Sequence, residues 1–260
     1  MRISAFALAL STLPAIAGAA DPACTAASGN ALTPVVELYT SEGCDSCPPA
    51  DRWFSGLKAE AARGKVVPLA FHVDYWDYLG WKDRFADPAF TARHREAASR
   101  GGAKVIYTPQ VLFDGREFSQ WRRTAAEKLA DGKAPRTPRA ELRIAATTVT
   151  ADANQLQLKI AGRTVPGARA ASAYVAIYEN GLASDVKAGE NKGVLLTHDY
   201  VVRRWLGPFA FDSAGTLSLA ETIELPADAV RSHAGIAVLA VDDRGSLLQS
   251  LALPLQRCGS

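Results

Sequence analysis

Two cysteines that stand two residues apart, Cys44 and Cys47, constrain the fold of this chain more than any other feature. They follow the apolar run Pro34–Thr40, which predicts a short buried strand, and they precede Pro48–Arg63, where apolar residues recur at helical spacing. A cysteine pair between a strand and a helix can form and break a disulfide within one turn, which is typical of a thiol–disulfide exchange site. A metal site and a purely structural disulfide are the alternatives.

The position of each cysteine predicts its role. Unpaired N–H groups and the helix dipole stabilise a thiolate at the start of a helix, so we assign Cys44 as the nucleophile and Cys47 as the thiol that resolves a mixed disulfide. Pro48 and Pro49 suit a first helical turn. They also indicate that the regular helix begins only after Cys47, which would weaken the dipole effect at Cys44. The carboxylate of Asp45 disfavours the Cys44 thiolate, so we expect a weak oxidant with a potential toward the isomerase or reductant range.

The N-terminus has the pattern of an export signal. Arg2 is followed by an almost entirely apolar stretch over residues 3–16 and by the small-residue cleavage site Ala17–Ala19. The stretch is short for a membrane span, and no later segment is long and apolar enough to be one. We therefore expect residues 1–20 to be removed and the mature protein to be soluble in the bacterial periplasm.

An exported chain meets an oxidising compartment, in which cysteines pair. Four cysteines allow three pairings, and with Cys44 joined to Cys47 the remaining two are Cys24 and Cys258, one near each end of the mature chain. We expect these two to form a structural disulfide, which contributes roughly 5 kcal/mol in the chain-entropy description. The alternative is a pair of free thiols on frayed ends.

The composition narrows the choice of partners. Charged residues make up 22% of the chain, and the formal net charge is +2. Lysine and arginine residues are scattered and form no basic stripe, so nothing favours nucleic acid or a membrane surface. No cofactor is expected. The predicted partners are protein thiols or disulfides, or a periplasmic redox protein.

The first half of the mature chain alternates strand and helix patterns. After the cysteine pair, Lys65–Val73 predicts a second buried strand, Pro88–Ser99 a helix, and Gln110–Phe118 a hairpin with an Asp-Gly turn. Ser119 is expected to cap a last helix that ends near Asp131. This order predicts an α/β domain, with a mixed sheet and helices on its faces.

The second half changes to strands. Residues 133–139 have the composition of a linker, and the chain from residue 140 onward contains runs that alternate apolar and polar residues, such as Leu156–Ile160 and Tyr174–Tyr178. About seven such runs, separated by turn residues, predict a β-sandwich. The expected organisation is a signal peptide over 1–20, an α/β domain over 21–132, the linker, and a β-sandwich domain over 140–260.

A resemblance to the thioredoxin superfamily covers residues 34–132. It rests on the strand, the Cys-x-x-Cys turn, the helix, and Tyr107–Gln110 before the hairpin. The resemblance implies a thioredoxin-like fold for the first domain. It also implies that Pro109 is a cis-proline beside the cysteines, and that the backbone of Thr108 binds an extended substrate as an added strand.

A narrower resemblance covers most of the mature chain. The segments Val36–Asp51, His72–Trp81, Tyr107–Gln110 and Gly189–Gly193 are together similar to the DUF1223 family of exported thioredoxin-like proteins. This resemblance implies a thioredoxin-like domain followed by a β-rich one. It implies no particular activity.

Two further residues are candidates for the site. Glu37 is a lone acid in an apolar strand, where many thioredoxin-like enzymes keep a buried acid as proton acceptor for the resolving thiol. The alternative is an acid that faces solvent at a strand edge. Trp76 belongs to the aromatic loop Asp74–Trp81, which either lines a groove beside Cys44 or packs against the second domain.

A metal site needs three or four ligands. Cys44 and Cys47 supply two, and His72 could lie near them, but the chain has no second Cys-x-x-Cys and no close histidine pair, so we expect no metal. The remaining histidines are isolated and are interpreted as structural or surface residues: His94, His198 and His233. Two polar segments, Tyr178–Gly181 and Gly189–Gly193, are interpreted as loops, with partner or cation binding as the alternative.

Two functions are consistent with the sequence. The first is a periplasmic thiol–disulfide oxidoreductase that acts on protein cysteines, which requires a reducible pair and an exposed Cys44. The second is a non-catalytic binding or scaffold module with a fixed Cys44–Cys47 disulfide, in which Cys44 would be buried or resistant to reduction.

Overall fold

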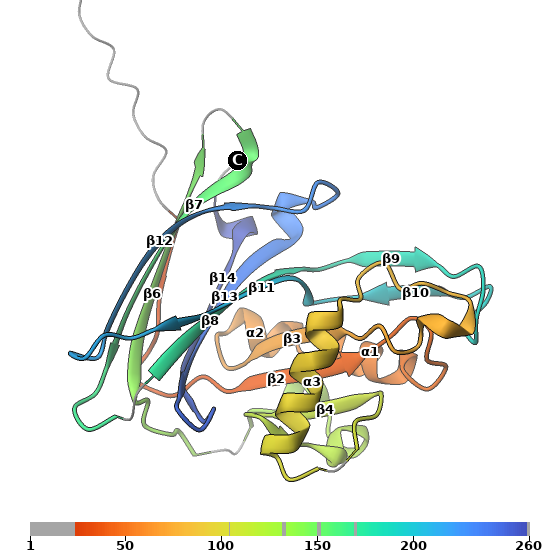
Figure 1. Cartoon of the computed structure of the whole chain (residues 1–260), viewed down its shortest axis with the longest axis horizontal. Coiled ribbons are helices and arrows are strands. Elements are labelled where there is room, and N and C mark those ends of the chain that lie inside the picture. The colour runs from red at the N-terminus through yellow and green to blue at the C-terminus, as the bar shows by residue number, and fades with distance from the viewer. Residues whose placement is uncertain (1–23, 104, 132–133, 150–151, 169–170, 259–260) are drawn as a thin grey trace, which may run out of the picture.

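The computed structural model describes residues 24–103, 105–131, 134–149, 152–168 and 171–258. An eight-stranded sheet and a four-stranded sheet dominate it, and a two-stranded hairpin lies at one end (Figure 1). The helices are few and short. The described chain is therefore mostly β-sheet, with strands in both halves of the sequence.

The eight-stranded sheet joins the two halves of the chain. Its order is β14-β13-β8-β11-β3-β2-β4-β5. The first half supplies β2 (Val35–Thr40), β3 (Val67–His72), β4 (Gln110–Phe113) and β5 (Arg116–Glu117), and the second half supplies β8 (Ala171–Glu179), β11 (Val201–Ala210), β13 (Ala234–Asp242) and β14 (Leu247–Pro254). At the junction, Val201 of β11 pairs with Ala70 of β3 in parallel. In this way β11 covers an edge of β3 that would otherwise expose unpaired N–H and C=O groups.

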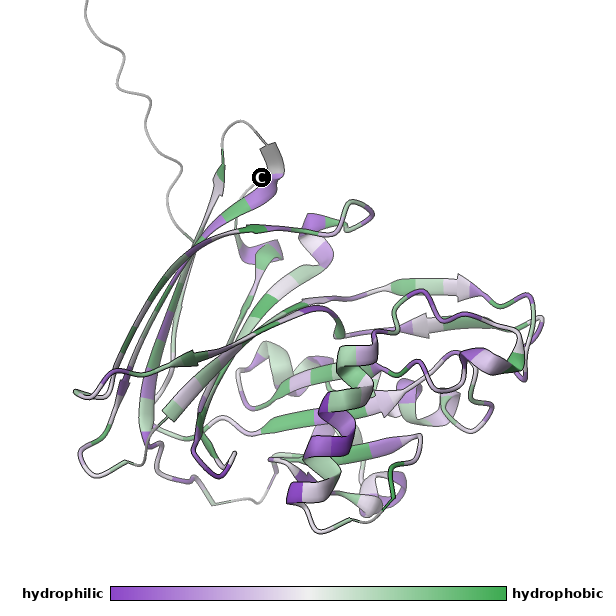
Figure 2. Cartoon of the chain, in the orientation of Figure 1, coloured by the Kyte–Doolittle hydropathy of each residue, from purple (hydrophilic) through white to green (hydrophobic). Residues whose placement is uncertain are grey.

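The strands of the first half form where their patterns predict them. β2 and β3 are parallel neighbours with every residue buried, which is typical of strands covered on both faces. Figure 2 shows them mostly in the colour of hydrophobic residues. β4 and β5 form the expected hairpin, and its turn residues Asp114 and Gly115 have φ values of 50° and 74°, as a type I′ turn requires.

Three α-helices accompany these strands. α1 (Pro48–Ser55) begins directly after the cysteine pair, and α2 (Lys58–Ala62) follows after a break at Gly56, where the sequence predicts one continuous helix. α3 (Pro88–Arg100) starts at the N-cap residue Asp87, whose carboxylate accepts a hydrogen bond from a backbone N–H of the first turn.

The helices cover opposite faces of β2. Thr40 donates a hydrogen bond to Asp51 of α1, whereas the ring of Tyr39 stacks on His94 of α3. Because successive side chains of a strand point to opposite faces, α1 and α3 lie on the two sides of the sheet. Residues 36, 38 and 40 therefore face α1, and residues 37 and 39 face α3.

The four-stranded sheet has the order β1-β6-β7-β12. Its strands are antiparallel: β1 (Cys24–Ala27), β6 (Ala140–Val149), β7 (Asp152–Thr164) and β12 (Thr216–Glu224). One face packs against β8, β13 and β14 of the larger sheet through a core that includes Leu142, Ile160, Val175 and Ile236. The expected strands of the second half are confirmed, and their core lies between two sheets.

One hairpin is not predicted by the sequence. β9 (Leu182–Asp185) pairs with β10 (Leu195–His198), and the loop between them carries Gly189–Gly193. Each strand has four residues, too few for a clear period of apolar and polar side chains. β10 contacts α1, so the hairpin lies beside the cysteine pair.

The expected helix between Ser119 and Asp131 is wrong. Two short 3-10 helices, Ser119–Arg123 and Ala126–Lys128, occupy this segment, and Ser119 makes no capping bond. Tertiary packing explains the difference. The indole N–H of Trp53 donates a 2.7 Å hydrogen bond to the carbonyl of Thr124 between the two turns, so this carbonyl does not serve a continuous helix.

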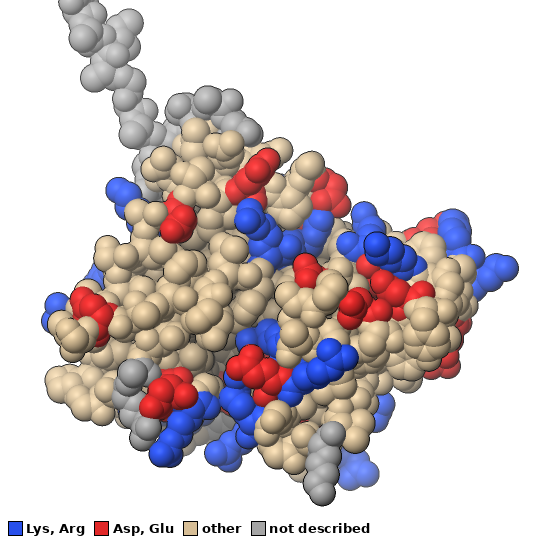
Figure 3. Space-filling model, in the orientation of Figure 1, with Lys and Arg blue, Asp and Glu red and all other residues tan. Residues whose placement is uncertain are grey.

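Cys24 and Cys258 form a disulfide with an S–S distance of 2.09 Å, the pairing expected from the sequence. The signal peptide expected over residues 1–20 lies outside the described residues. Among those described, no helix is long and apolar enough to cross a membrane. Residues 134–138 of the expected linker contain no helix or strand, while the division into two domains stays a prediction. Figure 3 shows acidic and basic side chains interspersed over the face it presents.

Candidate functional site

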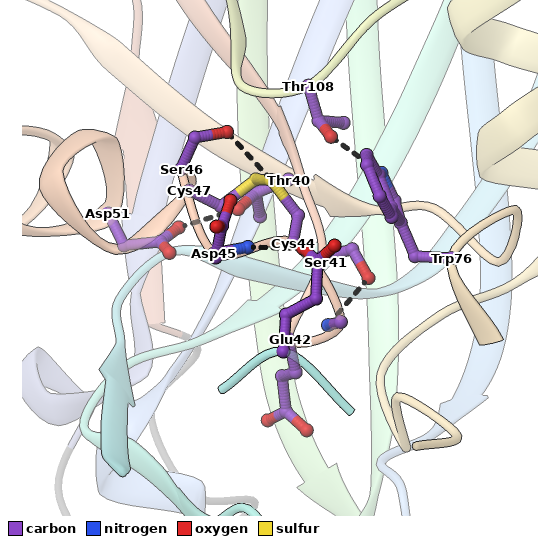
Figure 4. Close-up of a disulfide and its surroundings, with 12 residues drawn as sticks. Thr40, Ser41, Glu42, Cys44, Asp45, Ser46, Cys47, Asp51, Trp76 and Thr108 are labelled. Carbon is purple, nitrogen blue, oxygen red and sulfur yellow. Dashed lines mark hydrogen bonds between the residues drawn. A yellow bond between two sulfur atoms is a disulfide. The ribbon is translucent and has the colours of Figure 1, made fainter. Parts of the chain in front are cut away.

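Cys44 and Cys47 form a disulfide with their Cα atoms 5.4 Å apart (Figure 4). Cys47 is the N-cap residue of α1, and the helix starts at Pro48. Cys44 therefore lies one turn before the helix, as the proline pair indicates, and the helix dipole acts more on Cys47 than on Cys44. Both cysteines are 0% exposed, whereas Asp45 and Ser46 between them are exposed.

Ser46 contacts the sulfur of Cys44. Its hydroxyl oxygen lies 3.4 Å from the Cys44 Sγ atom. In the reduced state this hydroxyl can donate a hydrogen bond to a thiolate, which stabilises the charged form. Ser46 is not among the residues expected at the site from the sequence. The signal was available, because a hydroxyl inside a Cys-x-x-Cys turn cannot be far from the first sulfur.

The structure brings together the cysteine pair, Trp76 and the segment before β4. The Thr108–Pro109 peptide bond is cis. The indole N–H of Trp76 donates a 2.7 Å hydrogen bond to the Thr108 hydroxyl. A Cβ atom added to Gly43 would lie 3.0 Å from that of Trp76, so the loop before Cys44 packs directly on this tryptophan. Trp76 and Thr108, two of the three residues proposed for substrate binding, thus lie together beside the disulfide (Figure 4), and Pro109 directly follows Thr108 in the chain.

A loop from the second half of the chain covers the cysteine loop. The side-chain amide of Asn191 donates 2.9 Å hydrogen bonds to the carbonyl oxygens of Glu42 and Cys44. The carboxylate of Glu190 accepts a 3.1 Å hydrogen bond from the backbone N–H of Asp45. We call residues 186–194, between β9 and β10, the covering loop. The aromatic loop also touches it, because a Cβ atom on Gly189 would lie 3.2 Å from that of Trp81.

Five buried titratable residues lie behind the cysteine loop. We call them the acid–histidine cluster: Glu42, Asp51, His72, Asp83 and His198. His72 Nδ1 lies 2.7 Å from Asp83 Oδ2, and the imidazole rings of His72 and His198 are 4.8 Å apart. His198 Nε2 lies 3.4 Å from Glu42 Oε1, and its Nδ1 lies 3.9 Å from Asp51 Oδ1. Three carboxylates and two imidazoles thus share one interior site.

The charges of this cluster are unevenly distributed. Burial would lower the pKa of His72, but the carboxylates around it, chiefly Asp83, together outweigh this effect and raise that pKa. Burial would raise the pKa of Asp83, but His72 lowers it, so the two form an ion pair. Glu42 also has a lowered pKa, because the neighbouring His198 imidazole and a hydrogen bond from the Trp81 indole N–H outweigh its burial.

Asp51 behaves in the opposite way. Burial raises its pKa, and the nearby imidazoles of His198 and His72 only partly oppose this effect. Its carboxylate accepts a 3.0 Å hydrogen bond from Thr40. Asp51 is four residues after Cys47, on the first turns of α1. It is therefore the cluster residue best suited to hold a proton next to the cysteine pair.

The structure does not bring Glu37 to the cysteines. Its carboxylate forms an ion pair with Arg93 of α3 and accepts a 3.0 Å hydrogen bond from the Tyr39 hydroxyl, on the face of β2 opposite Asp51. Glu37 is 4% exposed, so it is a buried acid and does not face solvent. Its location follows from register, because residue 37 and residue 40 point to opposite faces of the strand.

The sequence suggests that His198 is isolated, and this interpretation is wrong. His198 is 2% exposed and contacts Glu42 and Asp51. His94 is a structural residue, stacked on Tyr39 with its Nε2 atom 2.5 Å from Gln110 Oε1. Within the described ranges, no group of three or more His, Cys, Asp or Glu side chains has the geometry to hold a metal ion. The covering-loop contacts and the acid–histidine cluster depend on residues far apart in sequence, so no local motif could identify them.

Comparisons with known proteins give the family. The chain belongs to the family described as "Protein of unknown function (DUF1223)", which matches residues 35–241. The X-ray crystal structure of protein AGR_C_4864 from Agrobacterium tumefaciens is similar to it, with a TM-score of 0.56 and 25% identity over 90% of this chain and 99% of that one. HBP35 of Porphyromonas gingivalis shares the fold with a TM-score of 0.64 at 12% identity, over 88% of this chain and 77% of that one. No curated protein matches the chain at a significant level.

Proposed function

We propose that this protein is an exported, periplasmic thiol–disulfide oxidoreductase that acts on protein cysteines through Cys44 and Cys47. In this proposal, residues 34–132 form a thioredoxin-like unit and residues 140–260 a β-sandwich that docks partners. One observation carries the proposal: the Cys44–Cys47 disulfide lies beside both Trp76 and the cis Thr108–Pro109 segment. This arrangement supports an extended substrate strand that lies along Thr108 and meets the disulfide.

The reaction exchanges two electrons. A substrate thiolate attacks the Cys44 sulfur, a mixed disulfide forms, and Cys47 leaves as a thiolate, which then takes up a proton. The second substrate thiolate attacks the substrate sulfur of the mixed disulfide, and Cys44 leaves. The substrate gains a disulfide, and the protein becomes a dithiol. Each step also runs in reverse, with the Cys44 thiolate as the nucleophile.

Asp51 supports this chemistry as the proton donor and acceptor for Cys47. Burial raises its pKa, so it can carry a proton closer to neutral pH than an exposed aspartate. In the proposal, the other four residues of the acid–histidine cluster hold Asp51 and the cysteine loop in position. Glu37, the residue expected from the sequence, is held by Arg93 on the other face of the sheet.

Access to Cys44 requires the covering loop to move. Both sulfurs are buried, and Asn191 and Glu190 hold the backbone of residues 42–45. Loops with exposed tips are among the segments that open at low free-energy cost. The carboxylates of Asp45 and Glu190 near Cys44 disfavour its thiolate, which supports a reducing rather than an oxidising potential.

A trapping experiment tests the proposal. The Cys47→Ser variant should accumulate mixed disulfides through Cys44 in the periplasm, and the Cys44→Ser/Cys47→Ser variant should trap nothing. A glutathione titration should give a reversible potential clearly more reducing than that of the strongest periplasmic oxidants. Absence of Cys44 adducts, or a Cys44–Cys47 pair that resists reduction in the native protein, would contradict the oxidoreductase.

The burial of both cysteines favours a second candidate, a binding or scaffold module with a fixed disulfide. In that case, dithiothreitol should reduce Cys44–Cys47 only under conditions that also unfold the protein. Partner capture by the intact protein should then be unchanged in the Cys44→Ser/Cys47→Ser variant.

A further inference from the structure

A pocket lined by α2 shares no residue with the cysteine site. Its volume is about 470 Å³, which is within the range of pockets for small organic molecules. α2, the start of β3, the ends of β8 and β14, and the C-terminal turn Leu255–Arg257 surround it. We call it the Tyr178 pocket. The larger cavity beside α3, of about 1250 Å³, is lined by ion pairs such as Arg93–Glu37 and Arg100–Glu96 that already satisfy their charges.

Two tyrosines form an aromatic wall of the Tyr178 pocket. The ring centroids of Tyr178 and Tyr200 are 5.6 Å apart. Tyr178 lies across Gly235 of the neighbouring strand, because a Cβ atom at Gly235 would lie 2.2 Å from its ring. Only glycine at position 235 leaves room for the ring in this position. The wall therefore requires a specific residue on the adjacent strand.

Tyr200 has an unusual backbone. Its φ value is +58°, in the left-handed region that bulky residues rarely adopt. Asn180 compensates for this conformation, since its side-chain oxygen accepts a 3.0 Å hydrogen bond from the N–H of Tyr200. Strained backbone of this kind concentrates at sites that bind ligands, where neighbouring groups fix it. Tyr178–Gly181, interpreted from the sequence as a loop, thus organises the pocket.

The pocket carries an excess of positive charge. Its charged lining residues are Lys58, Arg257 and Asp199. Lys58 pairs with Asp199 at 2.8 Å, so Arg257 is the cation without a carboxylate in the lining. Arg257 donates a 3.0 Å hydrogen bond to the carbonyl of Ala62, which uses one of its five N–H donors. A planar carboxylate is the acceptor that a guanidinium binds best.

The two tyrosines of the aromatic wall are uncharged. Burial raises the pKa of Tyr200 to about 12 and that of Tyr178 further, so both phenols stay protonated near neutral pH. The remaining walls are mostly apolar and include Val66, Pro68, Leu251 and Pro254. A ligand that fits therefore combines a flat apolar body with one anionic end.

We propose that the Tyr178 pocket binds a small aromatic carboxylate, with its ring against Tyr178 and Tyr200 and its carboxylate at Arg257. The Cys24–Cys258 disulfide contributes to this site, because Cys258 directly follows Arg257 and the bond anchors the C-terminal turn to β1. This site is independent of the Cys44–Cys47 chemistry and of the proposed oxidoreductase function.

The test is binding of 3-phenylpropionate to the purified, oxidised protein, followed by calorimetry and by NMR of the tyrosine ring signals. We expect saturable binding, with perturbation of Tyr178 and Tyr200. The uncharged analogue 3-phenylpropanol should bind at least tenfold more weakly. Arg257→Glu should weaken 3-phenylpropionate at least tenfold, whereas Arg163→Glu, an exposed arginine of β7 outside the pocket, should not.

A second variant tests the pocket independently, in case Arg257→Glu impairs folding. Ala61→Phe fills the pocket from α2, away from the disulfide, and should abolish binding while circular dichroism and thiol titration stay those of the wild type. Absence of saturable binding by the wild type overturns the proposal. So does equal binding of the anion and the alcohol, or binding that survives both Arg257→Glu and Ala61→Phe.

Discussion

The side-chain amide of Asn191 lies 2.9 Å from the carbonyl oxygen of Cys44, a residue 147 positions earlier in the chain. The same amide also bonds the carbonyl of Glu42. Because a single side chain satisfies two buried backbone acceptors, the covering loop and the cysteine loop are held as one unit. In the proposed function, the strength of this contact sets the access to Cys44.

Replacing Asn191 should therefore loosen the cysteine loop. Asn191→Ala leaves two buried carbonyl oxygens without their donor, so the free energy of unfolding should fall by about 2 kcal/mol. Reduction of Cys44–Cys47 by dithiothreitol should become roughly tenfold faster, since 1.4 kcal/mol of easier opening corresponds to a factor of about ten. Urea unfolding and stopped-flow thiol release measure the two effects.

Lys192→Ala is the matched control in the same loop, because Lys192 is exposed. Lys192→Ala should change neither the free energy of unfolding nor the rate at which dithiothreitol reduces Cys44–Cys47. Equal reduction rates for Asn191→Ala and the wild type would show that the covering loop does not limit access to the disulfide.

Glu37→Gln and Asp51→Asn should have opposite effects. Glu37→Gln leaves Arg93, whose side chain is 12% exposed, without its counter-charge, so the free energy of unfolding should fall by about 3 kcal/mol, with no change in the pH profile of thiol–disulfide exchange. Asp51→Asn removes a carboxyl whose raised pKa opposes folding at neutral pH, so stability should rise slightly. Exchange should become slower and lose its dependence on a group that titrates above the usual range of an aspartate.

Urea unfolding and stopped-flow exchange over pH 4–8 check both variants. The opposite result would be a changed pH profile of the exchange rate in Glu37→Gln and an unchanged one in Asp51→Asn. It would identify Glu37, not Asp51, as the proton acceptor.

The His72–Asp83 pair should give the stability a defined pH dependence. The pKa of His72 is raised on folding, so its contribution is complete below about pH 6.5 and is lost as the pH rises through the folded-state value. The pKa of Asp83 is lowered, so its contribution is complete above about pH 4 and is lost as the pH falls through the folded-state value. The pair should therefore stabilise the fold most between about pH 4 and 6.5.

Asp83→Asn should cost about 3 kcal/mol at pH 6 and flatten the decline of stability above that pH, as measured by urea unfolding at several pH values. Asp185→Asn, in an exposed pair with Lys187, is the control and should leave the profile unchanged. If the free energy of unfolding of Asp83→Asn declined with pH as steeply as that of the wild type, the His72–Asp83 pair would not be the source of the decline.

The Cys24–Cys258 disulfide should be a major source of stability. It closes a loop across a sequence separation of 234 residues, for which the chain-entropy description gives about 5 kcal/mol. The Cys24→Ser/Cys258→Ser variant should therefore unfold at a markedly lower urea concentration with the Cys44–Cys47 bond intact. A loss below about 1 kcal/mol would show that the chain ends are held by packing alone.

Much of the fold could be predicted from local patterns. The runs that became β2, β3, β6 and β7 contain enough apolar residues to define a strand by themselves. The Asp-Gly turn between β4 and β5 and the N-cap of α3 have equally local causes. The short strands β9 and β10 have no such local cause. The same is true of the 3-10 turns after β5, where the Trp53 side chain of α1 bonds the carbonyl of Thr124.

The candidate site also has parts that could be predicted from the sequence and parts that could not. The cysteine pair could be predicted from its spacing, and the segment around Pro109 from the resemblance that its residues carry, while Trp76 had two interpretations. The remaining contacts of the site depend on tertiary structure. Strand register turned Glu37 toward Arg93 and Thr40 toward Asp51, and the hairpin from the second half placed His198 and Asn191 against the cysteine loop. These outcomes depend on contacts between residues far apart in the chain, and such contacts form only when the sheets pack around a common core.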